Sequence, residues 1–331
     1  MLADNSWPFV SVVVPTYNRA RTLAMTLESL IAQSYDPKKY EILVVDNNSS
    51  DNTRQVVGQL QNKTVPPLRY FFEPRQGVHY ARNGVLKHAR GEILYYTDDD
   101  MIADVDLLKE IVKPFSYDLK VAAVTGRVLP KWEQEPPEWI LYLCRNHLLS
   151  LQDRPERLLI CSHDCGVISC HQALRREAFV KSGGYNPENT AGEWIGDGET
   201  GLNIKLQQLG YLFAYTSSSI THHMIPAERM TQRYLNKRLA NQGNSDSYTD
   251  YRRRNYTQLD LAMRIFSHVR RLAIESLMTM LKLSLNRGSW RLNRARIDYY
   301  RKRIAYDFRL MTDEKWREIV MRMDWLNESK M

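Results

Sequence analysis

The chain has 331 residues, of which 43% are hydrophobic and 25% are charged, and its formal net charge is +8 at pH 7. This composition is typical of a folded globular protein and excludes a short disulfide scaffold or a disordered chain. Residues 251–331 contain 19 Lys and Arg against 9 Asp and Glu, whereas residues 1–250 contain 27 against 29. The basic character therefore belongs to the last quarter, and the acidic balance before it argues against nucleic-acid binding.

The sequence gives no sign of export or of a membrane span. Residues 1–8 lack a basic region followed by an apolar core. The most apolar stretch, Leu272 to Leu285, contains Glu275 and Lys282 and is too short to cross a bilayer. We therefore expect a cytoplasmic protein, with peripheral attachment to the inner face of a membrane left open. Free thiols are then expected at Cys144, Cys161, Cys165 and Cys170.

Strands and helices alternate over the first 130 residues. The predicted strands are Phe9–Val14, Glu41–Val45, Leu68–Phe72, Ile93–Thr97 and Val121–Thr125. The predicted helices are Ala20–Gln33, Asp51–Leu60, Gly77–Ala89 and Val105–Phe115. This alternation predicts an α/β fold in which a mostly parallel central sheet is flanked by helices.

The pattern is less regular after residue 127. Residues 128–160 contain several prolines, which favours a connection that crosses the surface. The elements predicted next are a strand near Gly166–Cys170, a helix at about Thr200–Leu209 and a strand near Leu212–Tyr215. From about residue 252 the apolar spacing is helical.

Three polar segments follow predicted strand ends, at Pro15–Arg19, Asp46–Asp51 and Thr97–Asp100. Because ligands of parallel sheets bind beyond the carboxyl ends of the strands, we expect these segments to meet at one rim. Three consecutive aspartates repel one another, and a divalent cation would relieve that repulsion. Mg²⁺ and Mn²⁺ are usually held by one or two carboxylates together with substrate phosphates, so a substrate with a diphosphate is predicted.

The same segments resemble a known family. Val12–Arg19, Glu41–Thr53, Gly77–Arg82 and Asp98–Asp100 look like the nucleotide-sugar half of family 2 glycosyltransferases of the GT-A fold. The segments that resemble the acceptor half are Gly183-Gly184-Tyr185, Gly198-Glu199-Thr200 and Gly210-Tyr211. The order and spacing of these motifs make the resemblance strong. It implies a Rossmann-like GT-A domain over 1–230, divided into a nucleotide-sugar-binding half (1–127) and an acceptor-binding half (128–230), before a basic helical extension (231–331).

The resemblance also implies which residues hold the nucleotide sugar. The Pro15-Thr16 turn and Asp46 match positions that hold the base, usually uracil. Asp98 matches the contact to ribose and diphosphate and is a second candidate metal ligand, Asp100 matches the metal ligand, and Asp99 suits either role. The other candidates at the nucleotide sugar are Tyr17, Arg19, Asn48, Arg75, Arg82 and Arg229. For Arg75 and Arg82, an ordinary surface position is an equal alternative.

The catalytic base has two candidates. An inverting transfer needs a carboxylate near the acceptor hydroxyl to take its proton. Counting back from Gly210-Tyr211 places the family's base at Glu199, but Gly198 stands where the family usually has a second acid, so Asp197 competes. We favour Glu199, although an acid at a helix start is also simply stabilised by the helix dipole.

A histidine pair follows the last predicted strand. Related enzymes often place a metal-binding histidine there, and His223, two residues before Ile225-Pro226, matches that position better than His222. Imidazole is an acceptable ligand for Mn²⁺. A structural role for the histidine is equally open.

The resemblance implies a metal-dependent, inverting glycosyltransferase that uses Mn²⁺ or Mg²⁺. It would move a sugar from a nucleoside diphosphate, expected to be UDP, to a hydroxyl of a glycan or lipid-linked saccharide in polysaccharide biosynthesis. The alternatives are a sugar-nucleotide nucleotidyltransferase and a non-catalytic nucleotide-sugar-binding protein. The first of these should carry a glycine-rich loop near the first strand, which residues 14–19 lack.

The basic C-terminal region leaves two interpretations. Arg252–Arg254, Arg270-Arg271 and Arg301–Arg303 lie among apolar positions at helical spacing. Residues 252–310 either contact an anionic lipid surface, next to a lipid-linked acceptor, or pack on the catalytic domain with solvated basic faces.

Overall fold

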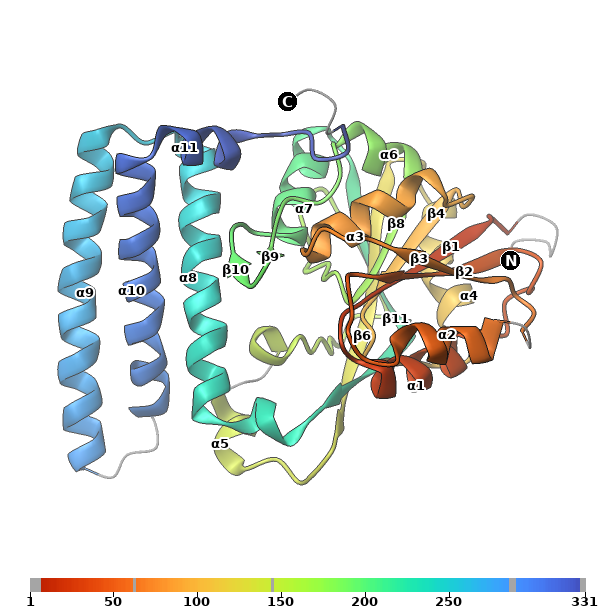
Figure 1. The fold of residues 1–331 in the computed structure, drawn as a ribbon, viewed down its shortest axis with the longest axis horizontal. Coiled ribbons are helices and arrows are strands. Elements are labelled where there is room, and N and C mark those ends of the chain that lie inside the picture. Colours follow the sequence, from red (N-terminus) through yellow and green to blue (C-terminus); the bar gives the residue numbers. More distant parts are fainter. Residues whose placement is uncertain (1–6, 62–63, 144–145, 286–289, 328–331) are drawn as a thin grey trace.

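The computed structural model describes residues 7–61, 64–143, 146–285 and 290–327. The chain forms a curled central sheet with helices on both faces and, beside it, an array of long helices (Figure 1). The predicted α/β fold class is therefore confirmed, together with the C-terminal helical extension.

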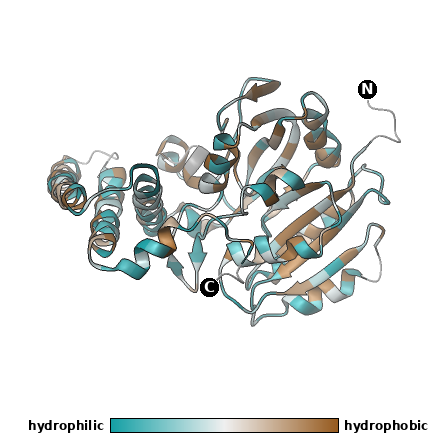
Figure 2. Cartoon of the chain, turned by 90° about the horizontal axis from the view of Figure 1, so that it is seen from above, coloured by the Kyte–Doolittle hydropathy of each residue, from teal (hydrophilic) through white to brown (hydrophobic). Residues whose placement is uncertain are grey.

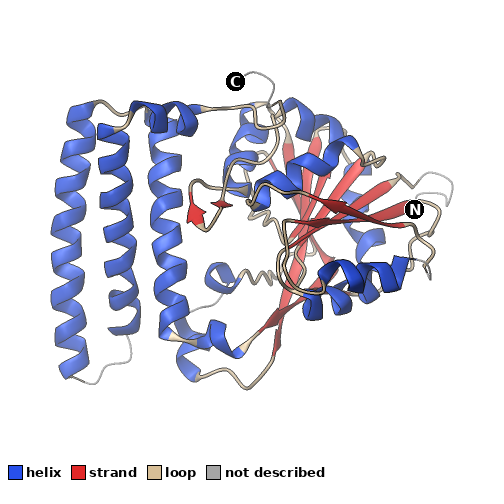
Figure 3. Ribbon diagram, in the orientation of Figure 1, coloured by secondary structure: helices blue, strands red, loops and turns tan. Residues whose placement is uncertain are grey.

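Within the described residues, nine strands form the central sheet in the order β3-β2-β1-β4-β8-β6-β11-β5, with β7 paired to β11 (Figure 3). Strands β3, β2, β1 and β4 are parallel, β8 is antiparallel to β4 and β6, and β11 is parallel to β6. The strands are β1 (Val10–Thr16), β2 (Tyr40–Asp46), β3 (Leu68–Phe72), β4 (Ile93–Thr97), β5 (Met101–Ala103), β6 (Val121–Trp132), β7 (Leu158–Cys161), β8 (His171–Arg175) and β11 (Leu212–Ile225). A separate hairpin joins β9 (Asn189–Thr190) and β10 (Glu193–Trp194).

Helices cover both faces of this sheet because alternate strand residues point to opposite sides. On β1, Val12 and Val14 enter the core under Leu23 and Leu27 of α1, whereas Val13 enters the opposite core. Figure 2 shows the hydrophobic residues gathered along these strands. The helices of this part are α1 (Ala20–Ile31), α2 (Thr53–Gln61), α3 (Val78–Gly84), α4 (Leu107–Val112), α5 (Glu138–Leu143), α6 (Arg176–Lys181) and α7 (Glu199–Gln208).

Two sequence predictions in the middle of the chain are wrong. The strand expected at Gly166–Cys170 begins only at His171, because residues 164–167 form a turn in which Asp164 accepts hydrogen bonds from two backbone N–H groups. Residues 128–160 are not only a surface connection, since β6 continues to Trp132 and β7 begins at Leu158. Pro130 is tolerated in β6 because it lies beyond the stretch where β8 pairs with that strand.

The C-terminal helices begin earlier than the apolar spacing indicated. They are α8 (Gln232–Arg254), α9 (Gln258–Ser284), α10 (Trp290–Thr312) and α11 (Glu314–Met321), and α10 lies between α8 and α9 (Figure 1). Helix α8 lies within the helical region predicted for 231–331, but the apolar spacing did not reveal it because the residues it buries include Gly243, Asn244 and Ser247. A Cβ atom at Gly243 would lie 2.4 Å from the backbone oxygen of Tyr299, so glycine allows α8 and α10 to touch.

The last described residues return to the sheet. Beyond α11, the backbone N–H of Trp325 donates to the oxygen of Gly183 (2.8 Å), and the ammonium of Lys205 donates to the oxygens of Gly184 (2.6 Å) and Met323 (3.2 Å). The helical array is therefore held to the α/β part at both of its ends.

Among the described helices, none combines the length and the apolar run that a transmembrane segment requires. Cys161, Cys165 and Cys170 carry free thiols, as predicted, and Cys144 lies outside the described residues.

The contact at Gly243 gives a stability prediction. We expect Gly243→Ala to destabilise the protein by about 1–3 kcal/mol, because the added methyl group must push α8 away from α10. The matched control is Gly58→Ala in α2, where a Cβ would meet nothing within 4 Å. That change should instead stabilise by about 0.5–1 kcal/mol. Urea unfolding measures both, and equal stabilities for the two variants would contradict the packing described.

Candidate active site

A cavity of about 340 Å³ opens at the carboxyl ends of the parallel strands. The predicted residues that it brings together are Pro15, Thr16, Tyr17, Arg19, Arg82, Asp98 and Asp99. They come from the ends of β1 and β4 and from α3, which places them at the rim where parallel sheets bind ligands.

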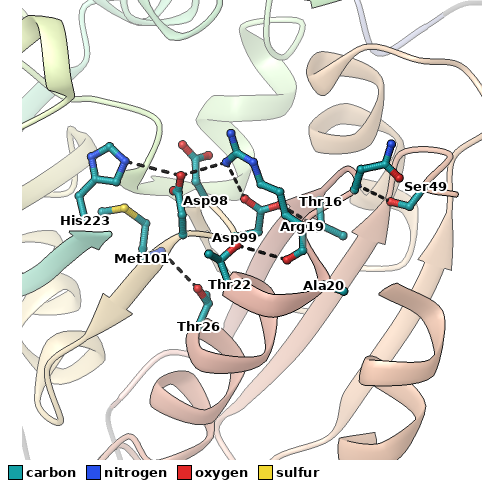
Figure 4. A network of polar contacts seen from close by, with 12 residues as sticks. Thr16, Arg19, Ala20, Thr22, Thr26, Ser49, Asp98, Asp99, Met101 and His223 are labelled. Atoms are coloured by element: carbon teal, nitrogen blue, oxygen red, sulfur yellow. Dashed lines mark hydrogen bonds and ion pairs between the residues drawn. The ribbon is translucent and has the colours of Figure 1, made fainter. Parts of the chain in front are cut away.

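The acidic residues after β4 are held by donors from the first strand and its following loop. The hydroxyl of Thr16 donates to Asp99 (2.7 Å), and the guanidinium of Arg19 donates to both Asp99 (3.0 Å) and Asp100 (2.9 Å; Figure 4). Burial raises the pKa of Asp99 to about 6, and the charge of Asp100 adds to the shift while Arg19 opposes it. The charge of Arg19 thus offsets part of the repulsion within the cluster.

A second set of contacts reaches Asp100 from the end of β11. Nε2 of His223 lies 3.6 Å from Oδ2 of Asp100, and Arg229 donates to both of these atoms, at 2.5 Å and 2.8 Å. Burial alone would raise the pKa of Asp100, but His223, Arg229 and Arg19 together hold it below its usual range. Adjacent His222 points the other way, to Asp104 (3.3 Å), because successive strand residues alternate.

Asp100 and His223 are the described residues that could supply ligands to a divalent cation here. Nδ1 of His223 donates to the backbone oxygen of Leu149 (2.8 Å), so when the ring is neutral its lone pair lies on Nε2, the nitrogen nearest Asp100. Such a second hydrogen bond is usual for a metal-binding histidine. Within the part of the chain that the structure describes, no three His, Cys, Asp or Glu side chains gather into a metal site. A cation here would therefore need further oxygens, which a diphosphate carries.

Arg82 connects the acidic rim to the acceptor half. Its side chain is only 4% exposed and donates to Asp98 (3.1 Å) and to Glu188 (3.3 Å). Its guanidinium also lies over the ring of Tyr185, 5.2 Å from the centroid. The surface position left open for Arg82 is thus wrong, because the side chain is buried between two carboxylates.

The two candidate bases lie in different surroundings. Burial and the charge of Glu188 raise the pKa of Glu199 to about 7, and Arg82 opposes the shift. Asp197 instead accepts hydrogen bonds from Asn186 (3.1 Å) and Thr249 (2.8 Å) and lines a separate small cavity. Burial raises the pKa of Asp197 as well. Glu199 therefore shares the charges of the rim, whereas Asp197 joins α8 to the β10–α7 connection.

Other candidates do not line the cavity. Both carboxylate oxygens of Asp46 are engaged, by the hydroxyl of Tyr70 (2.7 Å) and the N–H of Ser49 (2.8 Å). Asn48 is exposed with a positive φ of 70°, and Arg75 pairs with Glu73 (2.8 Å) on the surface. Arg229 lies at Asp100 rather than at the cavity wall.

Four residues that line the cavity were not predicted from the sequence, namely Asn47, Val78, Glu188 and Asn189. Asn47 lies inside the Glu41–Thr53 segment that resembles the family. Its amide holds the next loop by donating to the oxygen of Arg75 (2.7 Å) and accepting from the N–H of Gly77 (2.8 Å). Glu188 and Asn189 directly follow the Gly183–Pro187 turn, which was the available signal for them.

A comparison with protein families identifies the chain. The model described as Glycosyl transferase family 2 matches residues 11–183, just over half of the sequence. The chain belongs to this family. The match contains every lining residue of the cavity except Glu188 and Asn189.

Individual relatives match over shorter stretches. The GalNAc(5)-diNAcBac-PP-undecaprenol beta-1,3-glucosyltransferase of Campylobacter jejuni is 41% identical over 95 residues, 28% of this chain and 30% of that protein. Matches to several other curated relatives span about a quarter to a third of their length.

Solved structures agree on the fold of nearly the whole chain. A mannosyltransferase from Pyrobaculum calidifontis, in complex with GDP-Man and Mn²⁺, aligns over 94% of this chain and 89% of its own, with 20% identity and a TM-score of 0.60. Residues 1–349 of S. aureus TarS in complex with UDP align over 91% of both chains, with 16% identity and a TM-score of 0.51. These likenesses confirm the predicted GT-A architecture.

Proposed function

We propose that this protein transfers a sugar from a nucleoside diphosphate, expected to be UDP, to a hydroxyl of a glycan or lipid-linked saccharide, with inversion. The observation that supports this proposal most is the cavity at the strand ends, where Asp98 and Asp99 lie with Arg19 and Arg82. Family membership favours this activity over a nucleotidyltransferase or a non-catalytic binding protein. Relatives named for UDP and for a lipid-linked acceptor support the donor and acceptor classes.

The residues would divide the work as follows. Arg19 and Arg82 offer positive charge to the diphosphate, and Asp98, whose side chain is 35% exposed, is free to turn toward ribose or a cation. Asp100 and His223 would hold Mn²⁺ or Mg²⁺ together with diphosphate oxygens. When bound, this cation stabilises the negative charge that develops on the leaving diphosphate. Because Arg229 contacts both side chains, it has to move aside and can then turn toward the phosphates.

Glu199 is the proposed general base. Its pKa of about 7 lets it accept a proton from the acceptor hydroxyl near neutral pH and still be ionised beforehand. Asp197 is proposed to position the start of α7 instead, since its oxygens are hydrogen-bonded to Asn186 and Thr249.

Donor binding tests the proposed function. We expect UDP with Mn²⁺ to raise the melting temperature by several degrees, since saturation at about 100 times Kd contributes about 2.7 kcal/mol. Asp100→Ala should remove the Mn²⁺-dependent part of this shift. The control Asp153→Ala, at an exposed aspartate paired with Arg127, should leave it unchanged. The measurement is a thermal-shift panel of nucleoside diphosphates and nucleotide sugars, and the proposal fails if none stabilises the protein in a cation-dependent way.

The base assignment predicts a pH dependence. The raised pKa keeps Glu199 protonated, and inactive as a base, at low pH, so kcat/KM should rise with pH through about 7. Glu199→Gln should keep UDP binding, lose about 10²- to 10⁴-fold in turnover and abolish this pH dependence. Asp197→Asn should retain both the turnover and its pH dependence. UDP release from the best-binding nucleotide sugar is the readout, and loss of activity in Asp197→Asn with retention in Glu199→Gln would reverse the assignment.

The outer face of α9 supports the membrane interpretation of the C-terminal region. Leu259, Phe266 and Leu277, each at least 66% exposed, lie on the face opposite Leu261 and Thr279, which are buried. The predicted apolar spacing is therefore real, but it faces solvent rather than the catalytic domain. Exposed Arg270 and Arg271 accompany this stripe, and residues 251–331 are strongly basic. Apolar side chains among basic residues favour binding to an anionic lipid surface. We propose such a surface as the partner of the outer face of α9.

Vesicle flotation tests this contact. We expect the full chain to float with vesicles that contain phosphatidylglycerol and not with pure phosphatidylcholine. Phe266→Ser with Leu277→Ser should abolish flotation without loss of stability, because both side chains are exposed. Leu119→Ser, at a residue 83% exposed in another part of the chain, is the control. If the double variant floats as well as the Leu119→Ser control, the proposed membrane contact is contradicted.

A further inference from the structure

A second cavity, of about 480 Å³, lies between the β9–β10 hairpin and the helices α8, α10 and α11. Its wall includes Trp194 of the hairpin, Asn241 and Asn244 of α8, Lys302 of α10 and Trp316 of α11. All of these residues lie outside the stretch that matches the family model. The cavity is therefore built by parts of the chain that the family match does not cover.

Several polar groups in this wall have no partner in the described part of the chain. Asn244 is 92% buried, yet neither its amide nor that of Asn241 makes a hydrogen bond there. The indole N–H of Trp316, a residue 3% exposed, is also without an acceptor. By contrast, Asn293 of α10, which is similarly buried, uses its amide oxygen with Lys282 (2.8 Å) and its amide nitrogen with Glu275 (2.6 Å). The Trp316 N–H is a buried group that lacks the usual hydrogen bond, and the amides of Asn241 and Asn244 line the cavity, so these groups are available to a ligand.

The aromatic side chains of the wall are fixed in place. The indole N–H of Trp194 donates to the backbone oxygen of Gly196 (2.8 Å) and to the hydroxyl of Ser245 (2.6 Å). The guanidinium of Arg309 lies 3.6 Å from the ring centroid of Trp316. Amides that both donate and accept, next to rigid indole rings, match a saccharide, whose hydroxyls need both kinds of partner and whose C–H faces pack on aromatic rings.

The cavity adjoins the candidate active site through two elements. In the hairpin, Asn189 lines the donor cavity and pairs with Trp194, which lines the second cavity. On α8, the charge of Arg238 opposes the increase that burial causes in the pKa values of Glu188 and Glu199, and Asn241 follows it by about one helical turn. The hairpin therefore connects the donor cavity directly to the second cavity, and α8 runs from the surroundings of Glu199 toward it.

We propose that the second cavity is an acceptor subsite, which binds saccharide units beyond the one that carries the reacting hydroxyl. This inference rests on the proposed glycosyltransferase activity, because only then does an acceptor glycan need to extend from Glu199. The open amides of Asn241 and Asn244 bind sugar hydroxyls, and Trp194 supports a sugar ring.

The experiment uses the full chain and four probes, namely cellotetraose, maltotetraose, chitotetraose and mannotetraose. Saturation-transfer NMR detects binding, and tryptophan fluorescence gives the affinity. We expect at least one tetrasaccharide to bind saturably, with and without UDP and Mn²⁺. Asn241→Ala and Asn244→Ala should each weaken that binding about tenfold, the loss expected when a hydrogen bond to a buried polar group is removed. Asn241 is partly exposed, so its variant folds even if the buried Asn244 does not tolerate alanine.

Gln242→Ala is the matched control, because this residue is next to Asn241 on α8 but exposed and bonded to Asp246 (2.8 Å). It should bind the tetrasaccharide as the wild type does. The inference is overturned if no tetrasaccharide binds the wild type, or if Asn241→Ala binds as tightly as Gln242→Ala. Failure of the proposed function is separate, since it appears as the absence of a cation-dependent UDP shift in the wild type, whatever the tetrasaccharides do.

Discussion

Like-charge repulsion at the end of β4 is the constraint on which the site depends. Asp99 and Asp100 are both 4% exposed, so their charges can be tolerated only if the protein supplies cations. It supplies Arg19 after β1 and Arg229 beyond β11, while Arg82 on α3 pairs with the neighbouring Asp98. These ion pairs connect the aspartates after β4 to the first strand, the third helix and the last strand of the sheet. An anionic donor would add negative charge to these aspartates. The proposal therefore combines a divalent cation, which neutralises that charge, with an Arg229 that moves to make room for the cation.

The sequence predicted the donor half well because that half follows local rules. Buried parallel strands are short apolar runs, so β3 and β4 were located at their observed residues, and the polar residues after β1 and β4 met at one rim. Side-chain direction was less accessible. Asp46 lies at such a strand end, yet Tyr70 and Ser49 occupy both its oxygens. The preference for His223 over His222 came from its position before Ile225-Pro226, and the side to which each ring points became visible only in the structure, where His223 lies at Asp100 and His222 at Asp104.

The C-terminal region was predicted to be helical, but the apolar spacing did not locate its first helix, for a different physical reason. Helix α8 buries glycine, serine and asparagine because it touches α10 closely, so it lacks the apolar period by which helices are recognised. Helix α9 has that period, but the apolar side faces outward. The spacing of apolar residues shows which residues share one face of a helix. It does not show whether that face packs against the protein or against something else. The sequence therefore showed two alternatives for this region, and the exposure of Leu259, Phe266 and Leu277 favours one of them.

The return of the chain end to Gly183 and Lys205 affects how the protein can be divided. By sequence, the family domain ends before the helices begin, and a fragment stopping near residue 230 looks complete. In space, Trp325 and Met323 supply backbone partners to that domain, and buried Lys205, whose pKa burial lowers to about 7, depends on one of them. The α/β part is thus completed by residues that follow the C-terminal helices in the sequence. Exchanging helical regions between family members, to graft one acceptor preference onto another donor site, requires the tail and its docking surface to be transferred as one unit.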